Sequence, residues 1–239
     1  MKGIRVLLSA AVTIVAMSLS FAQGTWFDIG VKGAYGITMM ANKNIFDDRQ
    51  IDHRLSGGYG FGVTLGAHFA EDHGILVEYM RSTGGQKFDD ERTATKQLID
   101  YEWTTNDVLL LYRFSGNGGY FEIGPKVSFV SDIMRELEGT PMTDVSDFYE
   151  DKWYSGVLGF GTYIAGSEVF TIQAGIRLHY QFGDMVNESG QAAGFPVNET
   201  YESYDKTNLI MAQIHLEVNY AFGRFARRSC RDRWKLILF

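Results

Sequence analysis

Hydrophobic and polar residues alternate at every second position along much of this chain, most clearly over residues 108–130. Residues 108–114 place apolar side chains on one face, and residues 120–130 do the same with acidic, basic and glycine residues between them. The five residues that join these segments, 115–119, read Ser-Gly-Asn-Gly-Gly. Alternation with a period of two around a glycine turn predicts a β-hairpin.

Eight segments share this alternation and are predicted to be strands. They are residues 26–39, 55–69, 75–82, 98–114, 120–130, 153–164, 169–182 and 208–223. The connections between them are long and short in turn, and the long, polar ones are residues 40–54, 83–97, 131–152 and 183–206. Short turns at one end and long loops at the other are typical of outer-membrane barrels, and an even strand count places both termini at the short-turn, periplasmic end. The phase of residues 99–107 is ambiguous, so the direction of Trp103 is left open.

The period alone does not decide which face points inward, because a soluble eight-stranded barrel of the lipocalin kind has its apolar face inside. The second predicted strand separates the two cases. Its less apolar face reads Gly58, Gly60, Gly62, Thr64, Gly66 and His68. Facing a narrow lumen, such a row gives bulky side chains across the barrel room. The predicted fold class is therefore all-β, an eight-stranded antiparallel up-and-down transmembrane β-barrel with short periplasmic turns and long extracellular loops.

The two ends of the chain differ from its body. Residues 1–22 combine a basic start, a short apolar run and small residues before a cut, which predicts a signal peptide, with an N-terminal membrane anchor as the alternative. Residues 23–223 form the predicted barrel domain, and residues 224–239 form a basic tail with six Lys or Arg and one Asp. That tail is interpreted either as disordered or as a segment that touches anionic lipid headgroups.

Charge and cysteine content exclude some functions. The whole chain has a formal net charge of −7, and residues 23–223 carry −14 once the basic ends are removed. Unspecific nucleic-acid binding is excluded for such a body, because phosphate would be repelled. The single cysteine, Cys230, cannot form an internal disulfide. The predicted location is the bacterial outer membrane, with outer-membrane lipid around the wall.

The predicted lumen carries charged and histidine side chains of both signs. They are Asp28, Lys32, Glu78, Arg113, Glu122, Lys126, Arg177, His179, His215 and Glu217. The candidate site is a polar cluster of Lys32, Glu78, Glu122, Lys126, Arg177, His215 and Glu217. Eight strands leave an interior that side chains just fill, and buried charges persist when they are paired. The interpretation is a structural plug, with a narrow gated ion path as the alternative.

No catalytic or cofactor site is predicted. Small outer-membrane barrels include lipid-modifying enzymes, so that class is kept as a further alternative. Ser128, His179, His215 and Glu217 fall on the lumen face, and the chain has no His-x-Ser pair. A nucleophile needs its base within hydrogen-bonding reach. The predicted protein is therefore non-enzymatic, with no cofactor and no metal site.

Two acidic loops are the predicted interaction surfaces. Residues 131–152 carry a net charge of −5, and residues 183–206 carry −4. Both contain or adjoin aromatic residues, namely Phe148, Tyr149, Trp153, Phe195, Tyr201 and Tyr204. Exposed loop aromatics are typical binding anchors. Envelope or secretion proteins are the predicted partners, and plain solvated loops, or loops that bind Ca²⁺ without an EF-hand, are the alternatives.

A family resemblance becomes visible at residues 97–130. The segments Gln97-Leu-Ile-Asp-Tyr-Glu-Trp, Val108-Leu-Leu-Leu-Tyr-Arg-Phe and Tyr120-Phe-Glu-Ile-Gly-Pro-Lys resemble the PorT-type outer-membrane β-barrel family of Bacteroidetes. The resemblance implies the barrel fold and the outer-membrane location, and the namesake's role in protein secretion. Two features depart from the family pattern: Asp107 stands where a proline is common, and the chain continues beyond Phe222.

Overall fold

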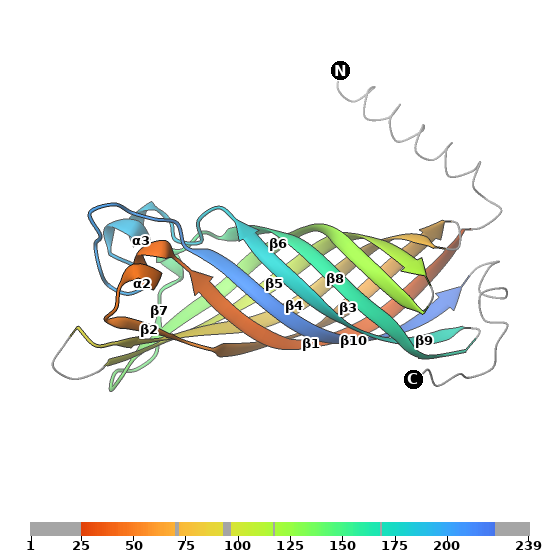
Figure 1. Ribbon diagram of the computed structural model, residues 1–239, viewed down its shortest axis with the longest axis horizontal. Helices are drawn as coiled ribbons and strands as arrows, with labels where there is room; N and C mark the ends of the chain where they lie inside the picture. Colours follow the sequence, from red (N-terminus) through yellow and green to blue (C-terminus); the bar gives the residue numbers. More distant parts are fainter. Residues whose placement is uncertain (1–24, 70–71, 93–96, 117, 168, 223–239) are drawn as a thin grey trace, which may run out of the picture.

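The computed structural model describes residues 25–69, 72–92, 97–116, 118–167 and 169–222. The predicted signal peptide, residues 1–22, and the basic tail, residues 224–239, lie outside these ranges. Eight long strands form the wall of the molecule (Figure 1). They are β1 (Trp26–Ala41), β3 (Ser56–Phe69), β4 (His73–Asp90), β5 (Gln97–Gly116), β6 (Gly119–Leu137), β8 (Lys152–Gly166), β9 (Phe170–Phe182) and β10 (Asn208–Phe222).

These strands close into a ring in which every neighbouring pair is antiparallel. The order around the ring is β4, β3, β1, β10, β9, β8, β6 and β5, and the pairing of β4 with β5 closes it. Closure gives every wall strand two partners, so no edge remains with unpaired backbone groups. The predicted eight-stranded antiparallel barrel is thereby confirmed.

The remaining elements are short and lie at the long-loop end of the barrel (Figure 1). They are α2 (Lys43–Asp47), β2 (Ile51–Arg54), β7 (Thr143–Asp144), the 3₁₀ turn η1 (Ser146–Phe148) and α3 (Glu188–Ala192). The side chains of Asn42 and Asn187 cap α2 and α3 by accepting backbone hydrogen bonds. Within the described ranges, no helix is long and apolar enough to cross a bilayer.

Two strands extend further toward the long loops than the alternation predicts. Residues 83–90 continue β4 and residues 131–137 continue β6, where loops were expected. The reason on β6 is a bulge: Thr104 pairs with Asp132 and Thr105 with Val130, so Ser131 has no partner. One extra residue reverses which positions point inward, and this hides the strand from a strict period-two reading. On β5 the alternation is unbroken, and Trp103 points inward, 2% exposed.

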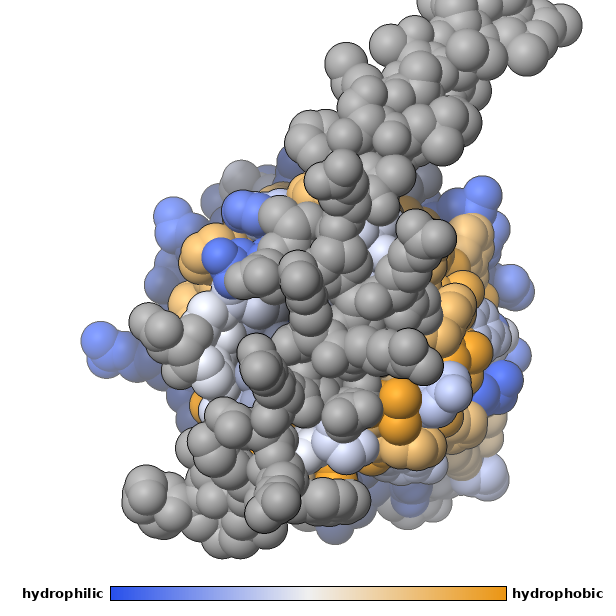
Figure 2. Space-filling model, turned by 90° about the vertical axis from the view of Figure 1, so that its right-hand side faces the viewer, coloured by the Kyte–Doolittle hydropathy of each residue, from blue (hydrophilic) through white to orange (hydrophobic). Residues whose placement is uncertain are grey.

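The outer wall is apolar and the interior is polar. Val31, Phe61 and Ile214 are 60–62% exposed on the outside, whereas Glu78, Glu122 and Glu217 are at most 1% exposed inside. Seen from the short-turn end, hydrophobic side chains lie along the visible outer wall (Figure 2). An apolar exterior on a closed ring is stable in lipid, because hydrocarbon cannot hydrogen-bond to an open edge. The protein is therefore an outer-membrane β-barrel, with its long loops outside the cell.

Candidate functional site in the barrel interior

Three acidic and three basic side chains form a closed ring inside the barrel. Each cation contacts two carboxylates, each carboxylate contacts two cations, and the nitrogen–oxygen distances run from 2.5 to 3.1 Å. In ring order the members are Lys32, Glu78, Arg177, Glu122, Arg113 and Glu217. All six are at most 4% exposed. We call this arrangement the charge ring.

The two arginines hold the charge ring together through their forked guanidinium groups. Arg177 Nη1 lies 2.6 Å from Glu78 Oε2, and Arg177 Nη2 lies 2.6 Å from Glu122 Oε2. Arg113 Nε donates to Glu122 Oε1 at 2.8 Å, while Arg113 Nη2 reaches Glu217 Oε2 at 3.1 Å. A planar guanidinium can bind carboxylates in two directions at once, which a lysine cannot do with the same geometry.

The charge ring spans the lumen because its members come from six different strands. Two of its links join direct register partners, Lys32 with Glu217 and Arg113 with Glu122. The other links cross the interior, from Glu78 on β4 to Arg177 on β9 and to Lys32 on β1. The ring therefore connects opposite walls of the barrel and fills its cross-section with paired charges.

Glycines on the inner face give these side chains their room. A Cβ on Gly159 would stand 3.0 Å from Glu122 Oε2, and one on Gly66 would stand 2.1 Å from Asp28 Oδ1. A Cβ on Gly30 would collide with the Asn219 amide at 1.8 Å. The glycine-rich inner face that favoured a membrane barrel in the sequence is thus explained by close approach of the lumen side chains.

Neutral polar groups complete the hydrogen bonding of the charge ring. Arg113 Nη1 donates to Gln173 Oε1 at 2.9 Å, and Asn219 Nδ2 donates to Glu217 Oε1 at 2.6 Å. The guanidinium of Arg113 also lies 4.5 Å from the centre of the Tyr120 ring. Such contacts matter because a buried ion pair is stable only when its remaining donors and acceptors are also satisfied.

The structure places all seven residues of the sequence-predicted cluster in the interior, but only five of them join the ring. Lys126 instead pairs with Asp107 at 3.0 Å, and His215 Nε2 hydrogen-bonds to the Tyr120 hydroxyl at 2.8 Å. The sixth ring member, Arg113, was predicted to face the lumen but was not in the candidate cluster.

Other interior residues also form contacts. Asp28 pairs with His68 at 2.8 Å, and His179 is buried with neither ring nitrogen hydrogen-bonded among the described residues. Asp107, Tyr120, Gln173 and Asn219 were missed as partners. Their positions in the alternation put them on the lumen face, so parity was the signal that could have found them.

The acidic half of the charge ring has a geometry that would also suit a cation. One oxygen from each of Glu78, Glu122 and Glu217 lies within 4.8 Å of the others. Three carboxylates at that spacing are a plausible oxygen donor set for a divalent metal. In this protein Lys32, Arg113 and Arg177 already supply three positive charges to the same oxygens. The residues therefore fit an internal salt-bridge network better than a metal centre.

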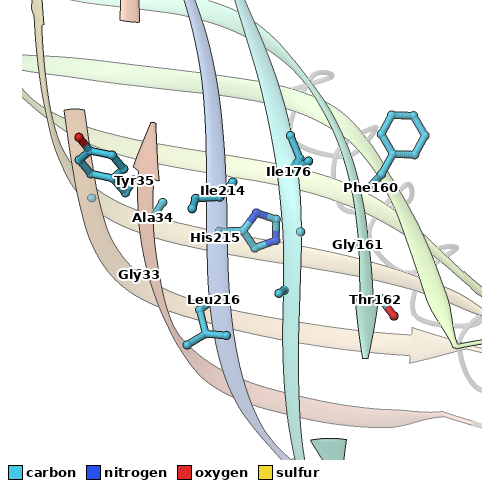
Figure 3. A pocket seen from close by; sticks show the side chains of 13 residues that line it. Gly33, Ala34, Tyr35, Phe160, Gly161, Thr162, Ile176, Ile214, His215 and Leu216 are labelled. Carbon is cyan, nitrogen blue, oxygen red and sulfur yellow. The ribbon is translucent and has the colours of Figure 1, made fainter. Parts of the chain in front are cut away.

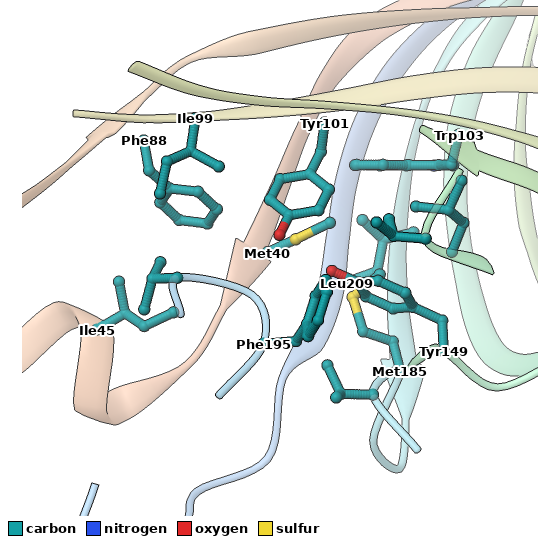
Figure 4. Packing of buried hydrophobic residues seen from close by; sticks show 14 of the residues in the cluster. Met40, Ile45, Phe88, Ile99, Tyr101, Trp103, Tyr149, Met185, Phe195 and Leu209 are labelled. Carbon is teal, nitrogen blue, oxygen red and sulfur yellow. The ribbon is translucent and has the colours of Figure 1, made fainter. Parts of the chain in front are cut away.

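The long-loop end of the barrel is closed by a second, hydrophobic layer (Figure 4). Its buried members come from the strand extensions and from the loops that fold over them. They are Met40, Ile45, Ile51, Phe88, Ile99, Tyr101, Trp103, Ile133, Val145, Tyr149, Trp153, Met185, Val186, Phe195, Val197, Leu209 and Met211. We call this cluster the extracellular cap. It places a packed apolar core above the charge ring.

The extracellular cap corrects the prediction that loop aromatics are exposed binding anchors. Tyr149, Trp153 and Phe195 are 2%, 1% and 6% exposed, and Phe148 and Tyr201 pack partly buried against them. Phe195 stacks on Phe148 with ring centres 4.4 Å apart. The physical reason is that the strand extensions form an apolar cup, and the loop aromatics bury more surface inside it than in water. Only Tyr204, 40% exposed, keeps the predicted character.

One carboxylate fastens the loop between β9 and β10. Asp184 Oδ1 accepts from the backbone N–H groups of Val186 and Thr207 at 3.0 and 3.1 Å, and Asp184 Oδ2 accepts from the Tyr204 hydroxyl at 2.5 Å. Partial burial, and then the hydrogen bond to Asp184, raise the pKa of Tyr204. Burial and the nearby Asp48 carboxylate raise the pKa of Tyr201 to about 12.

The outer wall has an apolar pocket on the side formed by β3, β1, β10, β9 and β8 (Figure 3). Its large lining side chains are exposed on that wall, and its small ones are mostly glycines. They are Tyr35, Phe160, Ile176, Ile214 and Leu216, with Gly33, Gly60, Gly161 and Gly175. A Cβ on Gly33 would meet nothing within 4 Å, so the surface is recessed where this glycine has no side chain. Its large apolar side chains belong to the lipid-facing surface, and the buried His215 of the lumen face also lines it.

No family model matches the sequence, and no curated protein matches it. Solved structures of similar shape include the Neisserial surface protein A, with 14% identity, 82% of this chain and 97% of that chain covered, and a TM-score of 0.45. The outer membrane protein OprG from Pseudomonas aeruginosa has 13% identity, with 84% of this chain and 97% of that chain covered, and a TM-score of 0.43. Ail of Yersinia pestis, in complex with the heparin analogue sucrose octasulfate, has 12% identity, covers 83% and 99%, and scores 0.41. At these identities no function transfers, and the fold assignment rests on the strand pairing of this chain.

Proposed function

We propose that this protein is a non-enzymatic outer-membrane scaffold, a sealed barrel that holds its extracellular loops for interaction with other envelope components. The observation that carries the proposal is closure at two levels. The charge ring fills the cross-section of the lumen, and the extracellular cap packs an apolar core above it. A barrel built for diffusion would need an open, hydrated path instead.

The interaction surface would be charged rather than aromatic. Residues 131–152 and 183–206 carry net charges of −5 and −4, while most of their aromatic side chains face the cap. Glu136, Glu150 and Glu202 are exposed on these segments. Complementary charge steers association and suppresses wrong partners. The partner we propose is therefore an envelope protein with a basic docking face.

The resemblance of residues 97–130 to PorT-type barrels supports a more specific role in protein secretion. The segments that carry this resemblance lie in β5 and β6. In the run Val108-Leu-Leu-Leu, the side chains of Leu109 and Leu111 are 1% and 0% exposed in the lumen. These are structural positions, so they support membership in that family of barrels more directly than its secretion role. Secretion is the finer form of the proposal.

The histidine contacts support a non-enzymatic role. In the described part of the chain, the hydrogen bonds of histidine rings run to Asp28, Tyr112 and Tyr120. A hydrolytic or acyl-transfer site would need a serine or similar nucleophile beside such a base. Mass analysis of lipid A from cells with and without the protein tests this reading, and a mass shift would favour the lipid-modifying alternative.

The main experiment is a mild-detergent pull-down of the tagged full-length protein from outer membranes, followed by mass spectrometry. We expect one or two stoichiometric envelope proteins. The combined variant Glu136→Gln, Glu150→Gln and Glu202→Gln should lose them, and the control Asp72→Asn at the short-turn end should retain them. A lone barrel in every sample would contradict the scaffold proposal.

Conductance in planar bilayers tests the sealed lumen separately. The wild-type protein should give no stable current steps, because the charge ring and the cap both block the path. Steady single-channel steps from the folded wild-type protein would instead support a narrow channel.

A further inference from the structure

The lipid-facing wall has a polar interruption on β4 and β5. Arg81 and Asn106 are register partners there, and both lie at outward positions of the alternation. The same outward row continues to Phe61 on β3 and Phe129 on β6, which are 61% and 42% exposed. Two polar side chains therefore stand between two exposed phenylalanines on the surface that faces lipid.

The register places this interruption at the extracellular border of the apolar wall. One outward step toward the short turns, Tyr79 pairs with Val108, and both are exposed apolar side chains. One outward step toward the loops, Thr83 pairs with Thr104. We call Arg81, Asn106, Thr83 and Thr104 the polar notch. On the neighbouring strand the apolar surface reaches further, because Tyr59 is the register partner of Thr83 and is 57% exposed.

In the polar notch, the Asn106 side chain is held by hydrogen bonds, whereas the Arg81 side chain has no partner of opposite charge within the described ranges. The Tyr79 hydroxyl donates to Asn106 Oδ1 at 2.9 Å, and Asn106 Nδ2 donates to Ser131 Oγ at 2.9 Å. The Arg81 side chain is exposed and makes no ion pair or hydrogen bond in the part of the chain that the structure describes. A lipid-facing arginine without a partner is unfavourable, and the penalty grows with depth in the bilayer. The anion present at this border in any bilayer is a lipid phosphate.

We propose that the polar notch binds the phosphate headgroup of an outer-leaflet lipid. Arg81 supplies the positive charge and a forked donor that matches phosphate oxygens. Asn106 has a second amide hydrogen left to donate, because only one of its two is used by Ser131. Phe61 and Phe129 border the notch where the first carbons of the acyl chains would lie. The occupant is a lipid rather than a protein segment because the notch is two strands wide and sits at headgroup depth.

The test is a lipid titration of the full-length protein in detergent micelles, read by native mass spectrometry. Phosphatidic acid is the probe, and diacylglycerol, which has the acyl chains without the phosphate, is the headgroup control. We expect one phosphatidic acid to bind the wild-type protein more tightly than diacylglycerol. Removal of one basic residue at an anionic surface weakens attraction by about fivefold, so Arg81→Gln should raise the dissociation constant of phosphatidic acid by about that factor.

Two further variants keep the result interpretable. Arg49→Gln removes the same charge from the exposed segment between α2 and β2 and should leave binding unchanged. Arg81→Lys keeps the charge without the fork and should retain part of the preference. Unchanged binding in Arg81→Gln, an equal loss in Arg49→Gln, or equal affinity of the wild-type protein for both lipids would overturn the proposal.

Discussion

Arg177 is the side chain whose loss should damage the charge ring most. Its Nε donates to Glu122 Oε2 at 2.8 Å, and its two terminal nitrogens reach Glu78 and Glu122 at 2.6 Å. Arg177→Met removes these contacts while keeping a long apolar stem. Glu78 is then left with Lys32, and Glu122 with Arg113. Both carboxylates stay buried, so neither can regain water in exchange.

The expected magnitude follows from that burial. Breaking a buried ion pair by removing one partner costs about 3–5 kcal/mol, because the remaining charge is left uncompensated. Here one substitution removes a cationic partner from two carboxylates, so the free energy of unfolding should fall by about the upper end of that range. Neutralising a stranded partner should restore part of it. The double variant Arg177→Met with Glu122→Gln should cost about 1–3 kcal/mol less than the sum of the single costs.

The assay is urea unfolding of the barrel in lipid vesicles, followed by tryptophan fluorescence and by the electrophoretic shift of the unheated, folded form. Lys126→Met is the matched control, because Lys126 is equally buried but has a single carboxylate partner, Asp107. Its cost should be smaller than that of Arg177→Met. A cost below about 1 kcal/mol for Arg177→Met, or strict additivity in the double variant, would refute the view that the ring acts as one buried network.

Three further predictions concern other parts of the chain. Gly161→Ala, whose Cβ would lie 2.1 Å from Tyr120 Cζ, should lower the free energy of unfolding by about 1–3 kcal/mol, whereas Gly33→Ala on the open outer wall should be nearly neutral in the same urea assay. Asp184→Ala should make residues 183–207 sensitive to protease in intact cells, and Glu202→Ala, an exposed acid on the same loop, should not. Tyr201 and Tyr204 have a higher pKa in the folded loop than in the unfolded chain. Their stabilisation of the folded loop is therefore fully present below the unfolded pKa near 10 and is lost as pH rises through the folded values. Protease sensitivity of this loop should therefore increase above about pH 10, and less in the double variant Tyr201→Phe and Tyr204→Phe.

The wall of the barrel could be read from the sequence because each strand lies between two unlike environments. Lipid on one side and a packed lumen on the other impose a strict period of two, as on β9 and β10. The same parity placed Lys32, Glu78, Glu122, Arg177 and Glu217 in the interior. Parity could not predict which of these residues form ion pairs, because a pair such as Glu78 with Arg177 depends on the stagger between strands that are far apart in the chain. Arg113 shows that parity identifies the face of a residue but not its partner.

The extracellular cap escaped prediction for a different reason. Its members come from segments far apart in the chain, as when the Tyr101 hydroxyl donates at 2.5 Å to the Pro196 carbonyl, 95 residues away. No local pattern encodes such a contact, and the bulge at Ser131 further reverses the alternation that leads into it. The net charges of residues 131–152 and 183–206 were counted correctly, but acids such as Glu136 and Glu150 are exposed around an apolar core.

The burial of the loop aromatics in the extracellular cap changes which residues can select a proposed partner. If the loop aromatics were exposed, single substitutions such as Phe195→Ala would remove binding anchors and leave the barrel intact. Because the Phe195 ring is 6% exposed, lies 4.7 Å from the Arg135 guanidinium and stacks on Phe148, the same substitution instead opens the cap and weakens the packing of residues 183–206 on residues 131–152. Loss of partner binding in such a variant would report a collapsed scaffold. Exposed acids such as Glu136 and Glu150 are the positions where binding can change without unfolding, and for that reason they, rather than the aromatics, are the residues with which to test the proposed interaction surface.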